Sequence, residues 1–420
     1  MKISATPSRL LVVMAGFFSD DSIPETTKIW VRALQNISVR MVIVFDNQEP
    51  LNVPDSWQNE SCMALFDRHA EYDFGSYKRG LQLAEQRGWL SEASHVLFCN
   101  DSVYGPVSEL QTTIKPMIAQ SNEAWGLTAS NQITPHLQSF FLLLGRSALE
   151  KPAIRNLFNG IKQQPHRQAV IDNYEIGLSQ ALLSEGISFK ALLDIDRCRM
   201  SYEGERMINP TAWPCSAMEL GMPVLKKKAL RDELANQEGF SETCRAVALR
   251  NPELWQSIIA ESPYWRLWCS HLKLGIIWQK NNLDLLEEQL NILRAHLNCN
   301  WSVLLPLDLR SRSDLSLELH KAINNGELKL TRPALETDSV LETILCSDHD
   351  WIAVVSSTIC DKPHRWSLIL RQLIHHPERN ILPGDPVVVR RHWWLQQGAR
   401  MKAVQEHHFE PVQISPNSMD

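Results

Sequence analysis

The chain has 420 residues, of which 44% are hydrophobic and 21% are charged, as in a folded globular protein with ample core material. This length exceeds the usual size of one domain, so two domains are expected. The formal net charge of −6 argues against a nucleic-acid partner, which would normally need a basic face. The nine cysteines include no Cys-x-x-Cys pair, which argues against a zinc site and fits reduced thiols in the cytoplasm.

Nothing in the sequence predicts a segment that crosses a membrane. No basic-then-apolar signal peptide opens the chain, and the apolar runs at 10–18 and 140–144 have the length of strands, well short of a bilayer span. We therefore expect a cytoplasmic protein whose membrane contact, if any, is peripheral and on the inner face of the plasma membrane.

Apolar runs alternate with segments of helical spacing through the first half of the chain. The run Leu10–Gly16 predicts a strand that is buried on both faces. Further strands are expected at 39–45, 62–66, 96–99, 125–129 and 140–144, and helices at 25–34, 77–86, 107–117 and 176–183. This alternation predicts an open, doubly wound α/β sheet, which binds ligands at the carboxyl ends of its strands.

Two segments place polar side chains at such strand ends. The segment 69–80 reads HAEYDFGSYKRG and opens a predicted helix. The strand at 96–99 is followed by Asn100, Asp101 and Ser102 and then by a Gly-Pro turn. The Asp101 carboxylate can hold Mg²⁺ or Mn²⁺ against a diphosphate, because hard cations prefer oxygen ligands. An ordinary turn also accounts for an Asn-Asp pair at this position.

Together with four further motifs, these segments resemble the rhamnan synthesis protein F family of bacterial polysaccharide glycosyltransferases. The further motifs are, in chain order, WGLTAS at 125–130, HLQSFF at 136–141, YEIGLS at 174–179 and NPT at 209–211. The resemblance covers about the first 230 residues, a span read from pattern alone. It implies a GT-A-like fold, with an open twisted sheet and flanking helices.

The resemblance also implies a function. The chain would be an inverting glycosyltransferase of O-antigen or rhamnan-type cell-surface polysaccharide synthesis. It would transfer a sugar, such as rhamnose from dTDP-rhamnose, from a nucleotide sugar donor to a lipid-linked glycan acceptor, alone or with other polysaccharide-assembly enzymes. A divalent cation, Mg²⁺ or Mn²⁺, is left open as cofactor, because Asp101 stands alone where many GT-A enzymes carry Asp-x-Asp. The alternative is a catalytically weak accessory subunit that positions a partner glycosyltransferase.

Two carboxylates are the expected catalytic groups. Asp101 would stabilise the leaving diphosphate, directly or through the metal. Glu175 would take the proton of the acceptor, since it opens a helical run where inverting GT-A enzymes carry their base, and a helix N-terminus lowers the pKa of a carboxyl. Asp172 is a rival for the base, and helix capping or the helix dipole also explains both acidic residues.

The remaining expected site residues bind the two substrates. Donor contacts are expected from Asp46, Asp73, Gly75, Lys78 and Asn100. Asp46 and Asp73 would form hydrogen bonds with the nucleotide. Gly75 would let the backbone approach the nucleotide closely, and Lys78 would neutralise phosphate charge. A turn, a helix cap and an exposed helix lysine remain open for Asp46, Asp73 and Lys78, respectively. Acceptor contacts are expected from His136, Gln138 and Ser139.

Four regions are expected along the chain: a GT-A-like domain at 1–235, a Trp-rich helical connection at 236–280, a second, smaller and degenerate GT-A-like unit at 281–405, and a flexible tail at 406–420. In the second unit Ser356, Ser357 and Thr358 stand where metal-binding aspartates would be needed, and an unrelated α/β appendage remains the alternative. The lysine run 226–228 is interpreted as a solvated helix face in preference to a contact with lipid head groups or a carrier diphosphate.

Overall fold

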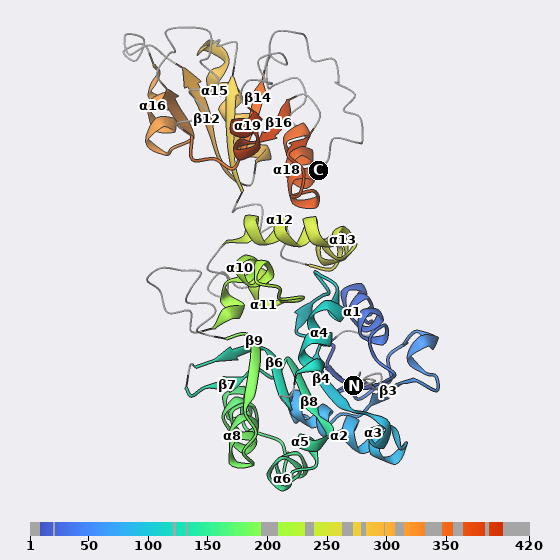
Figure 1. Ribbon diagram of the computed structural model, residues 1–420. Helices are drawn as coiled ribbons and strands as arrows, with labels where there is room; N and C mark the ends of the chain where they lie inside the picture. Colours follow the sequence, from blue (N-terminus) through green and yellow to red (C-terminus); the bar gives the residue numbers. More distant parts are fainter. Residues whose placement is uncertain are drawn as a thin grey trace. The chain divides into compact units, whose positions relative to one another are not determined.

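The computed structural model describes residues 9–19, 22–120, 123–131, 133–194, 209–231, 239–262, 272–278, 283–297, 299–306, 315–331, 347–355, 364–382 and 386–397. The chain divides into two compact units, residues 1–262 and 263–420. Each unit contains its own β-sheet with helices packed around it (Figure 1). The expected α/β class, with a second α/β unit, is therefore confirmed.

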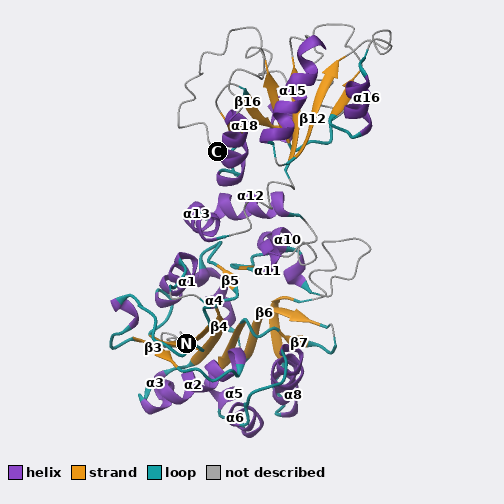
Figure 2. Cartoon of the chain, turned by 180° about the vertical axis from the view of Figure 1, so that it is seen from behind, coloured by secondary structure: helices purple, strands orange, loops and turns teal. Residues whose placement is uncertain are grey.

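The described part of the first unit contains an eight-stranded sheet in the order β3-β2-β1-β4-β8-β6-β7, with β9 beside β6. Figure 2 shows the strands of this sheet with helices around them. The strands β3, β2, β1 and β4 run parallel, whereas β8 is antiparallel to both β4 and β6. The strand bounds are β1 Leu10–Gly16, β2 Arg40–Phe45, β3 Cys62–Phe66, β4 His95–Asn100, β6 Ala124–Ser130, β7 His136–Leu137, β8 Phe141–Gly145 and β9 Phe189–Leu193.

Helices cover both faces of this sheet, because successive side chains of a strand point to opposite faces. Leu10, Val12 and Met14 of β1 pack in the core beneath α1 and α4. Leu11 and Val13 pack in the opposite core, beneath α2, α3, α5, α6 and α8. The helix bounds are α1 Glu25–Gln35, α2 Tyr72–Gln86, α3 Trp89–Glu92, α4 Leu110–Ala119, α5 Arg146–Leu149, α6 Pro152–Asn159 and α8 Gly177–Ser184.

The helix that ends in α8 begins earlier than the sequence predicts. The short helix α7, Arg167–Val170, continues into the π-helical segment η2, Ile171–Ile176, and η2 continues directly into α8. His166 caps the start of α7, where its side chain accepts a hydrogen bond from the Ala169 N–H. Glu175 therefore lies inside a continuous helix, so the expectation that a helix N-terminus lowers its pKa is wrong.

The described chain after residue 208 forms a separate two-stranded sheet with the segment that follows β4. The two-residue strands β5, Val103–Tyr104, and β10, Leu225–Lys226, pair in antiparallel fashion and place Lys226 opposite Val103. The Glu261 carboxylate accepts hydrogen bonds from the Thr26 N–H and hydroxyl at 2.9 and 2.7 Å, which fastens the end of α13 to α1. The other bounds here are η1 Asp55–Trp57, η3 Pro210–Ala212, α10 Pro214–Glu219, α11 Lys228–Arg231, α12 Phe240–Arg250 and α13 Pro252–Glu261.

The described part of the second unit contains a six-stranded sheet in the order β13-β12-β11-β14-β16-β15. The first four of these strands run parallel and β16 is antiparallel to β14, so this sheet repeats the order and directions of β3-β2-β1-β4-β8. Its bounds are β11 Lys273–Trp278, α15 Leu283–His296, β12 Asn300–Pro306, α16 Leu317–Asn324, β13 Leu328–Thr331, β14 Trp351–Val355, α18 His364–His375, β15 Ile381–Leu382, β16 Val387–Arg390 and α19 Arg391–Gln397.

The structure divides the chain differently from the expected domain boundaries. The expected connection at 236–280 is shared between the units, because α12 and α13 belong to the first unit while β11 is a central strand of the second sheet. Ser356, Ser357, Thr358 and the expected tail at 406–420 lie outside the described residues. Among the helices that the structure describes, none is long and apolar enough to span a bilayer.

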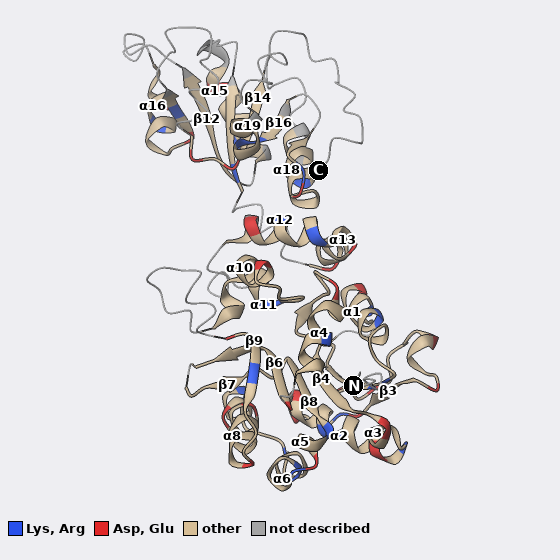
Figure 3. Cartoon of the chain, viewed as in Figure 1, with Lys and Arg blue, Asp and Glu red and all other residues tan. Residues whose placement is uncertain are grey.

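Acidic and basic side chains are interspersed on the helices around the first sheet (Figure 3). The helix α1, for example, carries charges of both signs, with Glu25 in its first turn and Arg32 in its last. This mixture agrees with the small net charge, and the described helices of the first unit form no uniformly basic layer.

Candidate functional site

Asp101 lies where the strand order of the first sheet reverses. From β1 the chain continues through β2 and β3 on one side, while β4 pairs with β1 on the other. The Asp101 N–H donates to the Ala15 carbonyl at 3.1 Å, and the Phe17 N–H lies 3.4 Å from Asp101 Oδ2. Open α/β sheets bind ligands outside the carboxyl ends of the strands at such a switch point, so the candidate site is centred here.

Asp73 and Asn100 join Asp101 at this point. The Asn100 side-chain amide donates to Asp73 Oδ2 at 2.7 Å, and its oxygen accepts from the Ser102 N–H and hydroxyl at 3.1 and 2.5 Å. The helix α2 begins at Tyr72, earlier than expected, and Glu71 occupies its N-cap position. Asp73 therefore lies within the first turn, and its side chain bonds to Asn100, which favours the site role over the capping role.

Two lysines that the sequence analysis assigned to a solvated face belong to this cluster. Lys226 Nζ donates to the Ser102 hydroxyl at 2.5 Å and lies 4.4 Å from the centroid of the Phe140 ring. Lys227 Nζ lies 5.4 Å from the centroid of the Tyr104 ring. The sequence signal for these lysines was a run of three in an acidic chain. Only the pairing of β10 with β5 shows that Lys226 and Lys227 lie beside Ser102.

The carboxylates and ammonium groups of the cluster perturb one another. Burial raises the pKa of the Asp101 carboxyl to about 6, although the charge of Lys227 opposes this shift. Burial likewise raises the pKa of Asp73, against the charge of Lys226 and the Asn100 hydrogen bond. Burial lowers the pKa of Lys226 to about 8, against the attraction of Asp73 and Glu175. Strongly perturbed groups gathered at a strand end are typical of functional sites.

Glu175 is held by His136 and Ser139. Its Oε2 accepts hydrogen bonds from the Ser139 N–H and hydroxyl at 2.8 and 2.5 Å, and its Oε1 lies 3.4 Å from His136 Nε2. Burial opposes ionisation of the carboxyl, yet the hydrogen bonds from His136 and Ser139 lower its pKa overall. Burial would lower the pKa of His136, but its bonds to Glu175 and the Thr134 carbonyl raise it overall. The two side chains are therefore joined by hydrogen bonds, and each favours the ionised form of the other.

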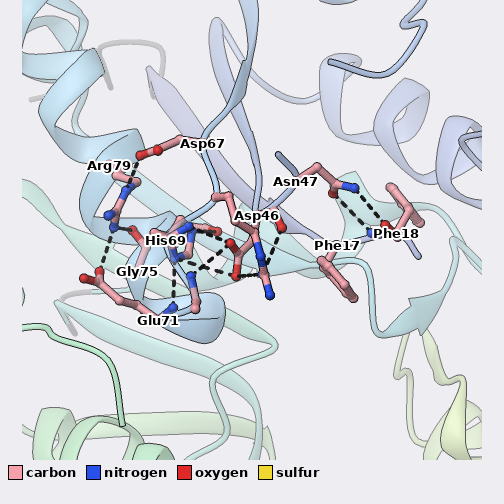
Figure 4. A network of polar contacts seen from close by, with 12 residues as sticks. Phe17, Phe18, Asp46, Asn47, Asp67, His69, Glu71, Gly75 and Arg79 are labelled. Atoms are coloured by element: carbon pink, nitrogen blue, oxygen red, sulfur yellow. Dashed lines mark hydrogen bonds and ion pairs between the residues drawn. The ribbon is translucent and has the colours of Figure 1, made fainter. Parts of the chain in front are cut away.

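Asp46 anchors the loop that leads into α2 (Figure 4). Its Oδ1 accepts from the His69 and Ala70 N–H groups at 2.8 and 3.1 Å, and its Oδ2 pairs with Arg68 at 2.9 Å. Two non-glycine residues here have positive φ, Ala70 in the loop at 55° and Tyr72 at the start of α2 at 57°. Asp46 thus stabilises an unusual backbone conformation beside the site through residues 23 and 24 positions away, and not through the local turn that the sequence analysis left open.

Aromatic rings that the sequence analysis did not single out are exposed at the same edge. Phe17, directly after β1, is 53% exposed, and Tyr72 at the start of α2 is 44% exposed. The Arg68 guanidinium lies 5.3 Å from the centroid of the Phe17 ring. Large apolar side chains are usually buried, so composition gives no hint that these two are exposed. The only sequence signal was their position, Phe17 directly after a strand and Tyr72 at the start of a helix.

Three expected site residues have other partners. Lys78 Nζ donates to the Ile161 carbonyl at 2.9 Å. The Gln138 side-chain oxygen accepts from the Thr128 hydroxyl at 2.7 Å. A Cβ at Gly75 would overlap the Glu71 side chain and lie 2.7 Å from His69 Nδ1, so the glycine is needed for packing within the loop of Figure 4. The rival base Asp172 is exposed and accepts from Gln168 at 2.8 Å.

The side chains around Asp101 are a poor match for a divalent cation. Asp101 is flanked by an amide that is already bonded to Asp73 and by a hydroxyl that is already bonded to Lys226. The nearest balancing charges are the ammonium groups of Lys226 and Lys227, which would repel a bound cation. Across the described ranges, no group of three or more His, Cys, Asp or Glu side chains is arranged to hold a metal ion.

Comparison with known families identifies the region that contains this site. Residues 63–245 match the sequence model of the rhamnan synthesis protein F family. The resemblance seen in the motifs is thereby confirmed over that span. It includes every residue of the cluster around Asp101, together with Glu175, His136 and Ser139, whereas Asp46 lies outside it.

Individual relatives share part of the chain. The virulence protein VirA of Vibrio anguillarum is 28% identical over 215 residues, which cover 45% of this chain and 68% of the relative. The glycosyltransferase GlyE of Streptococcus pneumoniae TIGR4 is 10% identical with a TM-score of 0.27, covering 87% of this chain and 91% of that one. A glycosyltransferase involved in glycosylation of the major capsid of PBCV-1 is 14% identical with a TM-score of 0.30, covering 54% and 97%.

Proposed function

We propose that this protein is an inverting glycosyltransferase of bacterial cell-surface polysaccharide synthesis. Its donor would be a nucleotide sugar, with dTDP-rhamnose as the first candidate, and its acceptor a lipid-linked glycan reached by peripheral contact with the cytoplasmic side of the membrane. The observation that carries the proposal is the rhamnan synthesis protein F match, because the matched residues 63–245 include the whole cluster of carboxylates and lysines at the switch point.

The donor nucleotide would lie along the exposed edge beside Asp46. The rings of Phe17 and Tyr72 offer apolar faces on which a nucleobase can stack, and Arg68 adds a planar cation next to Phe17. Asp46 contributes by holding Arg68 and the loop in place. A nucleotide in this position would direct its phosphates and sugar toward Asp101, whose Oδ2 lies 3.4 Å from the Phe17 N–H.

Inverting transfer needs a carboxylate that can accept the proton of the acceptor hydroxyl. We assign this role to Asp101, which is half-buried, and whose carboxyl has a pKa near 6 as a consequence of burial. Glu175 is less suited to it, because hydrogen bonds from Ser139 and His136 stabilise its ionised form. Its role would be to fix Ser139 and the adjoining Phe140 against Lys226, and so to shape the acceptor side of the site.

The acceptor-binding assignments change accordingly. His136 is only 3% exposed and has partners on both ring nitrogens, so it would act through Glu175. Gln138 is engaged by Thr128. Ser139 donates two hydrogen bonds to Glu175, and the Tyr77 hydroxyl donates to the Ser139 carbonyl at 2.9 Å, which fixes this turn from a second side.

The function is tested by measuring donor binding and transfer separately. Thermal unfolding of the full chain in the presence of dTDP-rhamnose, UDP-sugars and GDP-sugars should show stabilisation by one nucleotide class, since a ligand stabilises the state that binds it. Transfer from that donor to a membrane extract carrying lipid-linked glycans should then be lost in Asp101→Asn. Donor binding without transfer would favour the accessory-subunit alternative, and stabilisation by none of the nucleotide sugars would contradict a glycosyltransferase.

A further inference from the structure

Lys226 and Lys227 reach the switch point from a distant part of the chain. The pairing of β10 with β5 sets Lys226 opposite Val103, and the Lys227 N–H donates to the Ser102 carbonyl at 3.0 Å. Lys226 Nζ then bonds to the Ser102 hydroxyl, a contact between residues 124 positions apart. Both side chains are half-buried. A backbone pairing between distant segments therefore brings two partly buried cations to one strand end.

The carboxylates around these lysines are close enough to interact electrostatically but do not neutralise them by contact. Lys226 is attracted by Asp73, Glu175 and Asp101, and Lys227 by Asp101 and Glu261. Within the described residues, neither lysine forms an ion pair with any of these groups. Because an ammonium group has three donors, and Ser102 takes one from Lys226, donors remain for a ligand at this point.

The surroundings favour a specific site over a general basic surface. Charges of both signs are interspersed on the helices of the first unit (Figure 3), and the whole chain carries a net charge of −6. Phe140 lies beneath Lys226 at 4.4 Å and Tyr104 beneath Lys227 at 5.4 Å, so aromatic rings hold both ammonium groups in position. The third lysine of the run, Lys228, is exposed and begins α11.

We propose that Lys226 and Lys227 bind the diphosphate of the donor and stabilise it as the leaving group, in the place of a divalent cation on Asp101. This inference rests on the proposed glycosyltransferase function. In the transfer, the bond between the anomeric carbon and the diphosphate oxygen breaks, and its electron pair stays on that oxygen beside the two ammonium groups. The acceptor oxygen forms the new bond to the anomeric carbon, and its proton passes to Asp101.

This role explains two features of the site together. Positive charge is already present next to Asp73 and Asp101, where the side chains are a poor match for a metal ion. Preorganised cations that face developing negative charge stabilise a transition state without reorganisation during the reaction. Burial disfavours the charged form of both lysines. A diphosphate bound between the two ammonium groups would stabilise that charged form again.

The test measures nucleotide affinity in the absence of free metal. Titration calorimetry of the full chain in excess EDTA, with thymidine diphosphate, uridine diphosphate and the two nucleosides as probes, should show tighter binding of one diphosphate than of its nucleoside. Lys226→Gln and Lys227→Gln should each weaken diphosphate binding about tenfold and leave nucleoside binding unchanged. Lys228→Gln is the matched control and should bind like the parent.

The outcomes separate this inference from the proposed function. Parent-like diphosphate affinity in both glutamine variants, or diphosphate binding that EDTA abolishes and Mn²⁺ restores, would overturn the lysine role while leaving the glycosyltransferase assignment intact. A parent chain that binds neither diphosphate, with or without Mn²⁺, would overturn both. If Lys226→Gln fails to fold, Lys226→Arg keeps the charge and should retain metal-free binding, and Lys227→Gln still decides the question.

Discussion

Replacing Glu175 by glutamine is expected to destabilise the first unit more than it slows sugar transfer. The carboxylate accepts two hydrogen bonds from Ser139 and faces His136 Nε2 at 3.4 Å, and the two side chains of this pair are 13% and 4% exposed. A glutamine oxygen can still accept from Ser139. Its amide would meet the Nε2–H of a protonated His136 with a second donor, whereas a neutral His136, which keeps its Nδ1–H on the Thr134 carbonyl, can accept from that amide.

The size of the effect follows from these contacts. A hydrogen bond to a charged group contributes about 1 kcal/mol more than one to a neutral group, so the two Ser139 bonds account for about 2 kcal/mol. Loss of the stabilised imidazolium of His136, whose pKa the fold raises, adds about 1 kcal/mol where the parent histidine is protonated. For a unit of this size, the total corresponds to a fall in melting temperature of about 6–12 °C.

The effect should depend on pH in a defined direction. The folded-state pKa of His136 is raised, so its stabilisation is fully present below about pH 6.5 and is lost as pH rises through the folded value. The folded-state pKa of Glu175 is lowered, so its stabilisation is present above about pH 4.3 and is lost as pH falls through the folded value. The difference between parent and variant should therefore be largest between these two limits.

Calorimetric melting of the full chain across pH 4–9, with transfer rates measured alongside, checks this reasoning. Asp172→Asn is the matched control, since Asp172 lies in the same π-helical segment but is exposed, and its melting temperature should match that of the parent. A Glu175→Gln protein that melts like the parent at every pH, yet loses transfer by more than about 100-fold, would refute the argument and make Glu175 the base.

Three further changes have definite expected outcomes. Asp101→Asn should lower the transfer rate at least about 100-fold. It should also stabilise the protein above pH 6, with no gain below pH 4, because burial raises the folded pKa of Asp101. Equal melting temperatures of parent and variant at pH 8 would contradict this. Gly75→Ala should destabilise the first unit by about 1–3 kcal/mol in chemical unfolding, since its methyl group would overlap Glu71. A chain ending at Ser262 should bind nucleotide like the full chain, whereas one ending at Gly239 should be less stable in thermal melts, because it lacks the Glu261 contacts to α1.

The core of the fold could be predicted from local sequence patterns. The run Leu10–Gly16 is apolar at every position, and the structure buries all seven residues in the centre of a sheet covered on both faces. The strand ending at Asn100 places Asp101 at a carboxyl end, and parallel pairing of β1 with β4 turns that end into the switch point. Such patterns are informative because burial of a strand depends mainly on its own side chains.

The partners of the polar side chains depended on tertiary structure. Lys78 and Lys226 are both lysines beside apolar residues in the sequence, yet one bonds to the Ile161 carbonyl and the other to Ser102 in the site. Glu175 was expected to depend on a helix N-terminus, but its pKa is set by His136 and Ser139, which a separate part of the chain supplies. The sequence alone therefore determined the α/β class and the position of Asp101. The tertiary structure decided which cations and hydrogen bonds surround that carboxylate, because the segments that supply them lie more than one hundred residues apart. Polar contacts of this kind depend on where the chain returns, and they leave no local periodicity in the sequence.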